Sequence, residues 1–192
     1  MNKRTKTNTI RIIAGAWRGR RIPVLDFEGL RPTTDRVRET VFNWLMHDIA
    51  GANCLDLFAG SGVLGLECLS RSASFVQFVE KSAPVADGLT GNLDTLLSQD
   101  VDNRASVAQV SALEFLNKPA SMSFDMVFLD PPFKSDVFVT VMTLLVDNGW
   151  LNEGALVYLE QDSRQSDVLV PANWVLYRQG KAGQSAYFVY ST

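Results

Sequence analysis

The chain shows two patterns of hydrophobic and polar residues, and the change from one to the other falls near Asn53. Beyond this point, short apolar runs alternate with longer segments in which apolar residues recur at helical spacing. The apolar runs predict strands at 54–58, 75–79, 105–110, 124–129, 155–159, 174–178 and 185–190. The longer segments predict helices at 62–71, 83–98, 112–117 and 136–146. Such alternation is typical of an α/β fold in which helices cover both faces of a mostly parallel sheet.

The helix at 136–146 is predicted against local propensity, because its Val and Thr residues favour a strand. A parallel sheet needs a crossover connection at this point, and that requirement decides for a helix. The two final strands are joined through residues 180–183, which leaves no room for a helix. We therefore expect these two strands to form an antiparallel edge of the sheet.

The part before Asn53 predicts a small appendage. Segments 9–15 and 21–25 read as two strands of a hairpin around a turn at 17–20. After a loop at 27–32, Thr33 or Thr34 can cap a helix in which Val37, Val41, Trp44 and Leu45 share one face. Arg36 and Arg38 are expected to point elsewhere on that helix. We therefore divide the chain into an appendage, 1–50, and a larger domain, 51–192.

A glycine-rich motif, DLFAGSGVLG from Asp56 to Gly65, follows the first strand of the second part. Glycines allow a sharp turn and let a ligand approach the backbone. Gly60, Gly62 and Gly65 also match the dinucleotide fingerprint G-x-G-x-x-G, so this motif alone leaves a nicotinamide cofactor open. Glu80 ends the next strand, twenty residues after Gly60, where a carboxylate can accept hydrogen bonds from both ribose hydroxyls.

The tetrapeptide Asp130-Pro131-Pro132-Phe133 follows the strand at 124–129 and is the most informative short motif. Its prolines restrict the backbone and remove two N–H donors. Asp130 and the Pro131 carbonyl can then accept hydrogen bonds from an exocyclic amine, and Phe133 offers a ring on which a base can stack. Loops at the carboxyl ends of parallel strands line the ligand crevice, so we expect 56–62, 80 and 130–133 to converge.

Together, DLFAGSG, Glu80 and DPPF resemble the class I S-adenosylmethionine-dependent methyltransferases that act on amino groups of bases. The segments RIIAGAWRGRRIPV, GLRPTTDRVRETVFNWL, PANW and AGQSAY resemble the RsmD family of small-subunit ribosomal RNA guanine-N2 methyltransferases, over residues 9–190. The resemblance implies a Rossmann-like sheet of seven strands with its last strand antiparallel. It also implies methyl transfer from S-adenosylmethionine to N2 of a guanine in 16S rRNA, within the bacterial small ribosomal subunit or its assembly intermediate.

The resemblance assigns roles by position. The methionine end of the cofactor is held by Asp56, Phe58, Gly60 and Gly62, and its ribose by Glu80. The target guanine is held by the catalytic residues Asp130, Pro131, Pro132 and Phe133. Many class I enzymes bind the adenine through an Asp or Asn after the third strand. Here Ser111 and Ala112 occupy that place, so the adenine contact is expected from a backbone amide or the Ser111 hydroxyl.

Charge is distributed unevenly along the 192 residues. Residues 1–40 carry a net charge of +6, whereas the whole chain carries −3 and the remainder therefore −9. A basic arm on an acidic body indicates a polyanionic partner. The arginines predicted to contact RNA phosphates are Arg18, Arg20, Arg21, Arg31, Arg36 and Arg38. Trp17 can either stack on a base or pack on the hairpin.

Composition narrows the remaining possibilities. The uncharged stretch 137–146 is far shorter than the roughly 20 residues that span a bilayer, and residues 1–10 lack an apolar signal core. We therefore expect a cytoplasmic protein with reduced, buried cysteines, Cys54 and Cys68, and no metal site. A monomer is the default expectation. An adenine-N6 methyltransferase and a non-catalytic RNA-binding ribosome-assembly protein remain alternatives.

Overall fold

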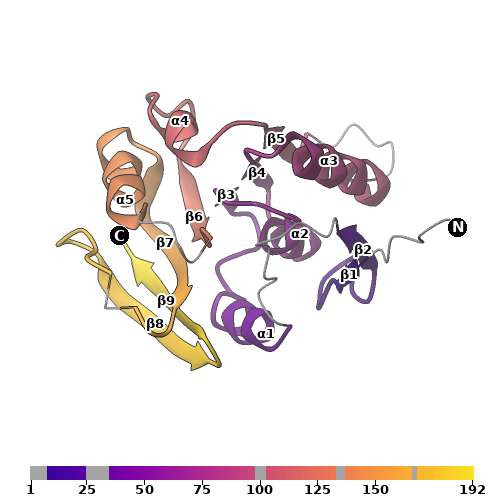
Figure 1. The fold of residues 1–192 in the computed structure, drawn as a ribbon, viewed down its shortest axis with the longest axis horizontal. Helices are drawn as coiled ribbons and strands as arrows, with labels where there is room; N and C mark the ends of the chain where they lie inside the picture. Colours follow the sequence, from indigo (N-terminus) through magenta and orange to yellow (C-terminus); the bar gives the residue numbers. More distant parts are fainter. Residues whose placement is uncertain (1–7, 25–34, 98–102, 133–136, 166–167) are drawn as a thin grey trace, which may run out of the picture.

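The computed structural model describes residues 8–24, 35–97, 103–132, 137–165 and 168–192. The predictions for Arg31, Thr33, Thr34 and Phe133 lie outside these residues. In the described ranges, a seven-stranded sheet forms the centre of the molecule and a separate two-stranded hairpin lies beside it (Figure 1).

The central sheet has the strand order β5-β4-β3-β6-β7-β9-β8. Its strands are β3 (Asn53–Asp56), β4 (Phe75–Val79), β5 (Ala105–Ala108), β6 (Phe124–Leu129), β7 (Leu151–Asp162), β8 (Val175–Ala182) and β9 (Ser185–Ser191). The first five pair in parallel, whereas β9 is antiparallel to both β7 and β8. The predicted fold class, a mostly parallel sheet with an antiparallel last strand, is confirmed.

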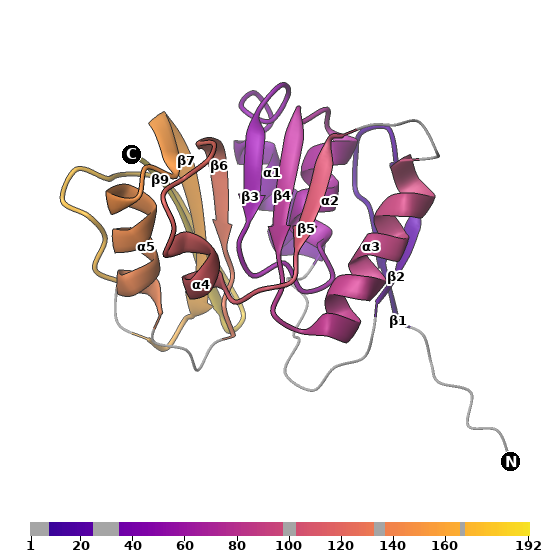
Figure 2. The same ribbon diagram turned by 90° about the horizontal axis from the view of Figure 1, so that it is seen from above.

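Helices cover both faces of this sheet (Figure 2). They are α1 (Asp35–Trp44), α2 (Val63–Ser70), α3 (Ala83–Leu97), α4 (Ala112–Leu116) and α5 (Phe138–Asp147). Alternate residues of each strand point to opposite faces. Accordingly, Met126 and Phe128 of β6 belong to the same buried cluster as residues of α1, α2 and α3, whereas Val127 and Leu129 belong to the cluster that contains residues of α4 and α5. Within the described ranges, no helix combines the length and apolar character that crossing a bilayer requires.

The appendage consists of the hairpin β1 (Asn8–Arg11) and β2 (Arg21–Val24), followed by α1. The first strand ends four residues before the predicted limit, because the chain turns toward α2 after Ile12. Gly15 has φ +82 there, and a Cβ at this position would lie 1.8 Å from the carbonyl oxygen of Ser70. The close approach of the hairpin to α2 thus shortens β1.

Two strands near the C-terminus are longer than predicted. β7 begins at Leu151 rather than at 155, with a register shift against β6 at the start. β8 continues through Gly180 to Ala182, because the tight turn lies at Gly183, where φ is +59. The predicted connection at 180–183 is therefore mostly strand.

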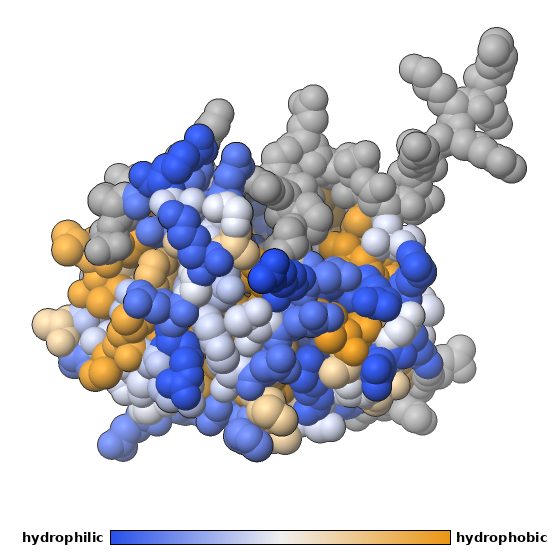
Figure 3. Space-filling view, turned by 90° about the horizontal axis from the view of Figure 1, so that it is seen from below, coloured by the Kyte–Doolittle hydropathy of each residue, from blue (hydrophilic) through white to orange (hydrophobic). Residues whose placement is uncertain are grey.

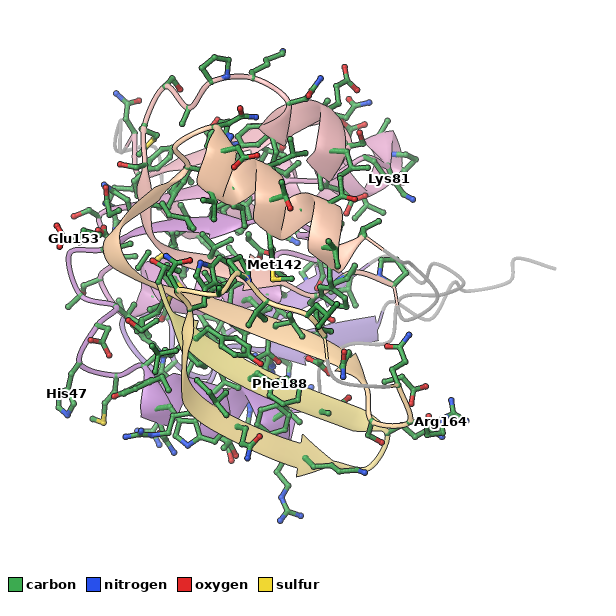
Figure 4. All side chains as sticks on the ribbon, turned by 90° about the vertical axis from the view of Figure 1, so that its left-hand side faces the viewer. His47, Lys81, Met142, Glu153, Arg164 and Phe188 are labelled. Atoms are coloured by element: carbon green, nitrogen blue, oxygen red, sulfur yellow. The ribbon has the colours of Figure 1, made fainter. Side chains whose placement is uncertain are left out.

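The carboxyl ends of the parallel strands mark one end of the molecule. Figure 4 shows Lys81, which follows β4, and Arg164, which follows β7, at this end. His47 and Glu153 lie at the opposite end in the same view. His47 is the single histidine of the chain, so no histidine side chain is available beside the ends of the parallel strands.

An apolar groove runs along α5. It is lined by Val139, Met142 and Val146 of the helix and by Leu169 and Pro171 of the segment before β8. Figure 3 shows apolar surface near the left margin, the side on which α5 lies in Figure 1. Because α1 and α2 cover the other face of the sheet, this groove is separate from the appendage.

Candidate active site

The central strands β3 and β6 form the point where the strand order reverses. From β3 the chain continues to β4 and β5 on one side, and from β6 to β7 on the other. In open parallel sheets, ligands bind outside the carboxyl ends of the strands at such a point. The Leu57 N–H donates to the Phe128 carbonyl over 3.2 Å, so the loops after β3 and β6 begin side by side.

The loop after β3 is the predicted glycine turn. Gly60 has φ +51 and Gly62 has φ +74, conformations that side chains rarely adopt. A Cβ on Gly62 would lie 2.3 Å from Cδ1 of Leu89. Gly62 is the N-cap of α2 and gives no side-chain cap, and in the first turn of the helix Asp56 accepts a hydrogen bond from the Gly65 N–H. The turn therefore brings backbone donors to the crevice.

Glu80 lies at the end of β4 and supports this turn. One carboxylate oxygen accepts a hydrogen bond from the Gly60 N–H at 2.9 Å, and the other accepts one from the Ser82 N–H at 2.7 Å. Each oxygen has two acceptor positions. Half-buried Glu80 can therefore hold the turn and still accept hydrogen bonds from a ligand's hydroxyl groups.

Asp56 lies beneath the turn, with 2% of its surface exposed. Its carboxylate accepts a hydrogen bond from the Gly65 N–H at 3.0 Å. Burial raises the pKa of Asp56 from 3.8 to about 7; the Gly65 hydrogen bond opposes this rise, and the charge of Glu80 adds to it. Asp56 is therefore a carboxyl group whose charge near neutral pH depends on what lies next to it.

Asp130 and Pro131 follow β6 directly, at the crevice; Asp130 is half-buried and Pro131 is buried. Beside them on β7, the buried Tyr158 hydroxyl donates to Glu160 over 2.7 Å. Burial, with the charges of Glu160 and Asp130, raises the pKa of Tyr158 well above its usual range. Tyr158 therefore remains a neutral donor, and Asp130 lies close enough to affect it.

The remaining predicted cofactor residues occupy the neighbouring loops. Phe58 is half-buried and packs against the core on the α4–α5 face. Ser111 caps α4, because its hydroxyl accepts a hydrogen bond from the Glu114 N–H at 3.2 Å. Ala112 is buried at the start of the same helix. The Val110 N–H donates to the Glu80 carbonyl, which places this loop next to the end of β4.

Four predicted RNA-contacting arginines of the described residues are exposed: Arg18, Arg20, Arg21 and Arg36. The prediction for Arg38 is wrong. Its side chain is fully buried, because position 38 shares the inner face of α1 with Val41 and Phe42, three and four residues later. Trp17 is 7% exposed and belongs to the core, so the packing alternative holds for this residue.

The sequence interpretation also missed the partner of Arg38. Glu67 lies in the middle of α2 and is 0% exposed, with Arg38 Nη1 3.3 Å from its Oε1. The sequence held a signal, since Glu67 is the one charged residue of the apolar segment VLGLECLS, and a carboxylate on such a helix needs a cation or donors. The hydrogen-bonded pair Tyr158–Glu160 was also not predicted. Its signal in the sequence is two polar side chains at the end of an apolar strand.

Two further features of the described residues concern the cysteines and possible metal ligands. Cys54 and Cys68 are buried and free, as predicted. No group of three or more His, Cys, Asp or Glu side chains in the described ranges is arranged to hold a metal ion.

Comparison with known proteins agrees with this geometry. The chain is 49% identical over 181 residues to "Ribosomal RNA small subunit methyltransferase D" of Escherichia coli K12, covering 94% of this chain and 89% of that protein. The solved structure of the Escherichia coli protein yhhF has 46% identity and a TM-score of 0.87, covering 96% of this chain and 98% of that chain.

A more distant solved structure shares the fold. It is magnesium protoporphyrin IX methyltransferase from Synechocystis, with 13% identity and a TM-score of 0.61 over 81% of this chain and 78% of that chain. Residues 10–191 match the family described as "Conserved hypothetical protein 95". The chain therefore belongs to this family, the RsmD family, which confirms the family predicted from its motifs.

Proposed function

We propose that this chain transfers a methyl group from S-adenosylmethionine to the exocyclic N2 of a guanine in 16S rRNA of the small ribosomal subunit. The main support is the position of Asp130 directly after β6, beside the glycine turn that follows β3. The name of the 49%-identical relative supports a small-subunit rRNA substrate. The names of the similar proteins from Escherichia coli are those of methyltransferases, which favours S-adenosylmethionine over the nicotinamide alternative.

The residues at the turn fit S-adenosylmethionine. Gly62 has no side chain and precedes the first residue of α2, so a ligand at the crevice would meet backbone there. Glu80 can accept hydrogen bonds from the ribose hydroxyls, and buried Asp56 can pair with the ammonium group of the methionine portion. Phe58 and the Ser111–Ala112 loop would flank the methionine and adenine ends, respectively.

When bound, S-adenosylmethionine would supply a sulfonium methyl group. The bond from N2 to the methyl carbon would form as the sulfur–carbon bond breaks and leaves a neutral thioether, and the proton lost by the amine would pass to the carboxylate of Asp130 and on to solvent. Asp130 and the Pro131 carbonyl accept hydrogen bonds from the two amine hydrogens and so direct the nitrogen lone pair. This alignment and the removal of water supply the rate enhancement. No histidine is needed, in keeping with the distant position of His47 (Figure 4).

The exposed arginines of the appendage would contact RNA phosphates. Arg18, Arg20 and Arg21 project from the hairpin, and Arg36 from α1. Phosphate contacts position a nucleic acid without reading its sequence. The target guanine is then turned out of its stack into the crevice, which costs a few kcal/mol. We place this reaction in the cytoplasm and assign it to a single chain, since the appendage and the crevice belong to the same protein.

Replacing Asp130 tests this proposal. Asp130→Ala removes one of the two acceptors, so methyl transfer to unmodified small subunits should fall about 100-fold or more, the cost of misplacing a reacting group by roughly 1 Å. Calorimetry with S-adenosylhomocysteine should show unchanged cofactor binding in the same variant. Transfer at the wild-type rate would refute the assignment.

Mass spectrometry of rRNA nucleosides after reaction with the wild-type protein identifies the base. N2-methylguanosine is expected. Methylated adenine would support the adenine-N6 alternative, and RNA binding without methyl transfer would support the assembly-protein alternative.

A further inference from the structure

We infer that Glu67 and Ser70 are positioning residues that fix the RNA-contacting appendage to α2 in one orientation. This inference rests on the proposed function, in which the arginines of the appendage hold RNA while Asp130 holds the target base. α2 begins at the glycine turn and ends at Ser70, which contacts the chain between β1 and β2, and the hairpin lies beside the helix (Figure 1). Its eight residues span about 12 Å, at 1.5 Å per residue.

Glu67 joins three segments at the middle of α2. Its Oε1 accepts hydrogen bonds from the Ile13 N–H of the hairpin and from Arg38 Nη1 of α1, the latter over 3.3 Å. Its Oε2 accepts one from Arg71 Nε over 3.4 Å, within the same helical segment. The carboxylate therefore holds both parts of the appendage against α2.

Arg38 extends this connection within the appendage. Its Nη2 donates to the Arg11 carbonyl at 3.0 Å and to Asp35 at 2.6 Å. One guanidinium group thus joins the end of β1, the start of α1 and Glu67. Arg38 and Glu67 are both fully buried, so breaking the pair would be costly, although Asp35 would still face Arg38 and Arg71 would still face Glu67.

Ser70 forms a second connection, one turn further along α2. Its hydroxyl donates to the Ala14 carbonyl at 2.6 Å and accepts a hydrogen bond from the Trp17 N–H at 3.0 Å. Its own carbonyl accepts a hydrogen bond from the Ala16 N–H at 2.7 Å. Residues 14–17, which lead into the turn that carries exposed Arg18, are therefore held against the end of α2.

These contacts fix the appendage to the helix that begins at the crevice, so that the appendage is not a mobile arm. A rigid connection sets the distance between the phosphates held by the arginines and the base held at Asp130. If the connection loosens, RNA can still bind to the arginines, but the base reaches the crevice less often in the reactive orientation. The defect should therefore appear in kcat at saturating substrate more than in KM.

The test compares Glu67→Gln and Ser70→Ala with a matched control. Glu67→Gln removes the charge that pairs with Arg38, and Ser70→Ala removes two hydrogen bonds at no change in charge. The control is Asp125→Asn. Asp125 accepts hydrogen bonds from the Asn53 N–H at 2.8 Å and from Asn152 Nδ2 at 2.6 Å, within the central sheet and away from the appendage.

We would measure the rate of methyl transfer from labelled S-adenosylmethionine to unmodified small subunits at saturating substrate. Dividing this rate by the concentration of sites that bind S-adenosylhomocysteine gives kcat per functional site. Glu67→Gln should lower this kcat by up to about 100-fold, and Ser70→Ala by less, with cofactor affinity unchanged. Asp125→Asn should keep the wild-type kcat per site even where it lowers the melting temperature. This difference separates positioning from a general loss of stability.

The inference is overturned if Ser70→Ala and the folded fraction of Glu67→Gln both keep the wild-type kcat. It is also overturned if the kcat of the control, Asp125→Asn, falls by as much as theirs. Failure of the proposed function would appear differently. In that case the wild-type protein itself would not methylate the particles, or its binding would not respond to replacement of Arg18, Arg20 and Arg21.

Discussion

Replacing Asp56 with asparagine tests the burial of a carboxyl group beneath the glycine turn. The side chain is 2% exposed, and desolvation raises its pKa from 3.8 to about 7. Asparagine has nearly the same shape, and its amide oxygen can still accept the Gly65 N–H. It cannot titrate, so the two proteins should differ mainly in how their free energies of unfolding depend on pH.

The direction of the pH dependence of stability follows from proton uptake on folding. In the unfolded chain Asp56 ionises near pH 3.8, and in the folded chain near pH 7. Between these values the folded protein binds a proton that the unfolded chain lacks, so the contribution of Asp56 to the free energy of unfolding falls as pH rises. A shift of about three units corresponds to roughly 4 kcal/mol at about 1.4 kcal/mol per unit.

Urea unfolding of both proteins between pH 4.5 and 8 measures this effect. Taking the difference between them at each pH removes the contribution of other titrating groups. Wild-type stability relative to Asp56→Asn should fall by about 3 to 4 kcal/mol across the range and level off above about pH 7. A difference that stays constant with pH would refute the buried-carboxyl reasoning.

The same experiment examines the proposed cofactor contact. An ammonium group beside Asp56 favours the ionised form and should lower its pKa. Saturating S-adenosylhomocysteine should therefore flatten the pH-dependent difference between the two proteins. An unchanged difference in the bound state would leave Asp56 as a support of the turn without contact to the cofactor.

Three further predictions concern the appendage, the packing of α2 and the end of β4. Replacing Arg18, Arg20 and Arg21 with glutamine should reduce the slope of log affinity against log salt by about one unit for each arginine–phosphate pair removed, measured with small-subunit rRNA; an unchanged slope would count against these pairs. Gly65→Ala should destabilise the fold by about 1–3 kcal/mol, because the new Cβ would lie 2.2 Å from Cε1 of Phe78. In the control Gly91→Ala on α3, the new Cβ meets nothing within 4 Å, so this change should stabilise the fold by up to about 1 kcal/mol. Thermal unfolding measures both changes. Glu80→Gln should weaken S-adenosylhomocysteine binding in calorimetry without changing RNA affinity, and equal losses in both would contradict a role in cofactor binding.

The strand–helix alternation was predictable because each element carries its own periodicity. The helix α5 shows that topology can decide where propensity fails: its Val and Thr residues favour a strand, yet Phe138–Asp147 is helical because the parallel pair β6–β7 needs a crossover. The limits of β1 and β8 were not predictable in the same way. They depend on contacts with Ser70 and on the position of the turn at Gly183, which local patterns do not specify.

The candidate site was predictable where chemistry is encoded in a short motif. The glycine turn, Glu80 and Asp130 could be found because they follow strands whose ends meet in a parallel sheet. Arg38 shows the opposite case. Its charge suggested a solvent-exposed side chain, but helical spacing with Val41 and Phe42 places it inside, where Glu67 neutralises it. The burial of Arg38 depends on its ion pair with Glu67, which lies 29 residues later in the sequence.

The position of β9 has a consequence for shortened forms of the protein. β9 follows β8 in the chain but lies between β7 and β8 in the sheet. A truncation before Ser185 would therefore delete an interior strand instead of trimming the margin. It would release β8 and expose the backbone N–H and C=O groups of β7, a template for pairing with other chains. We expect such fragments to aggregate, although every residue assigned to the crevice would still be present.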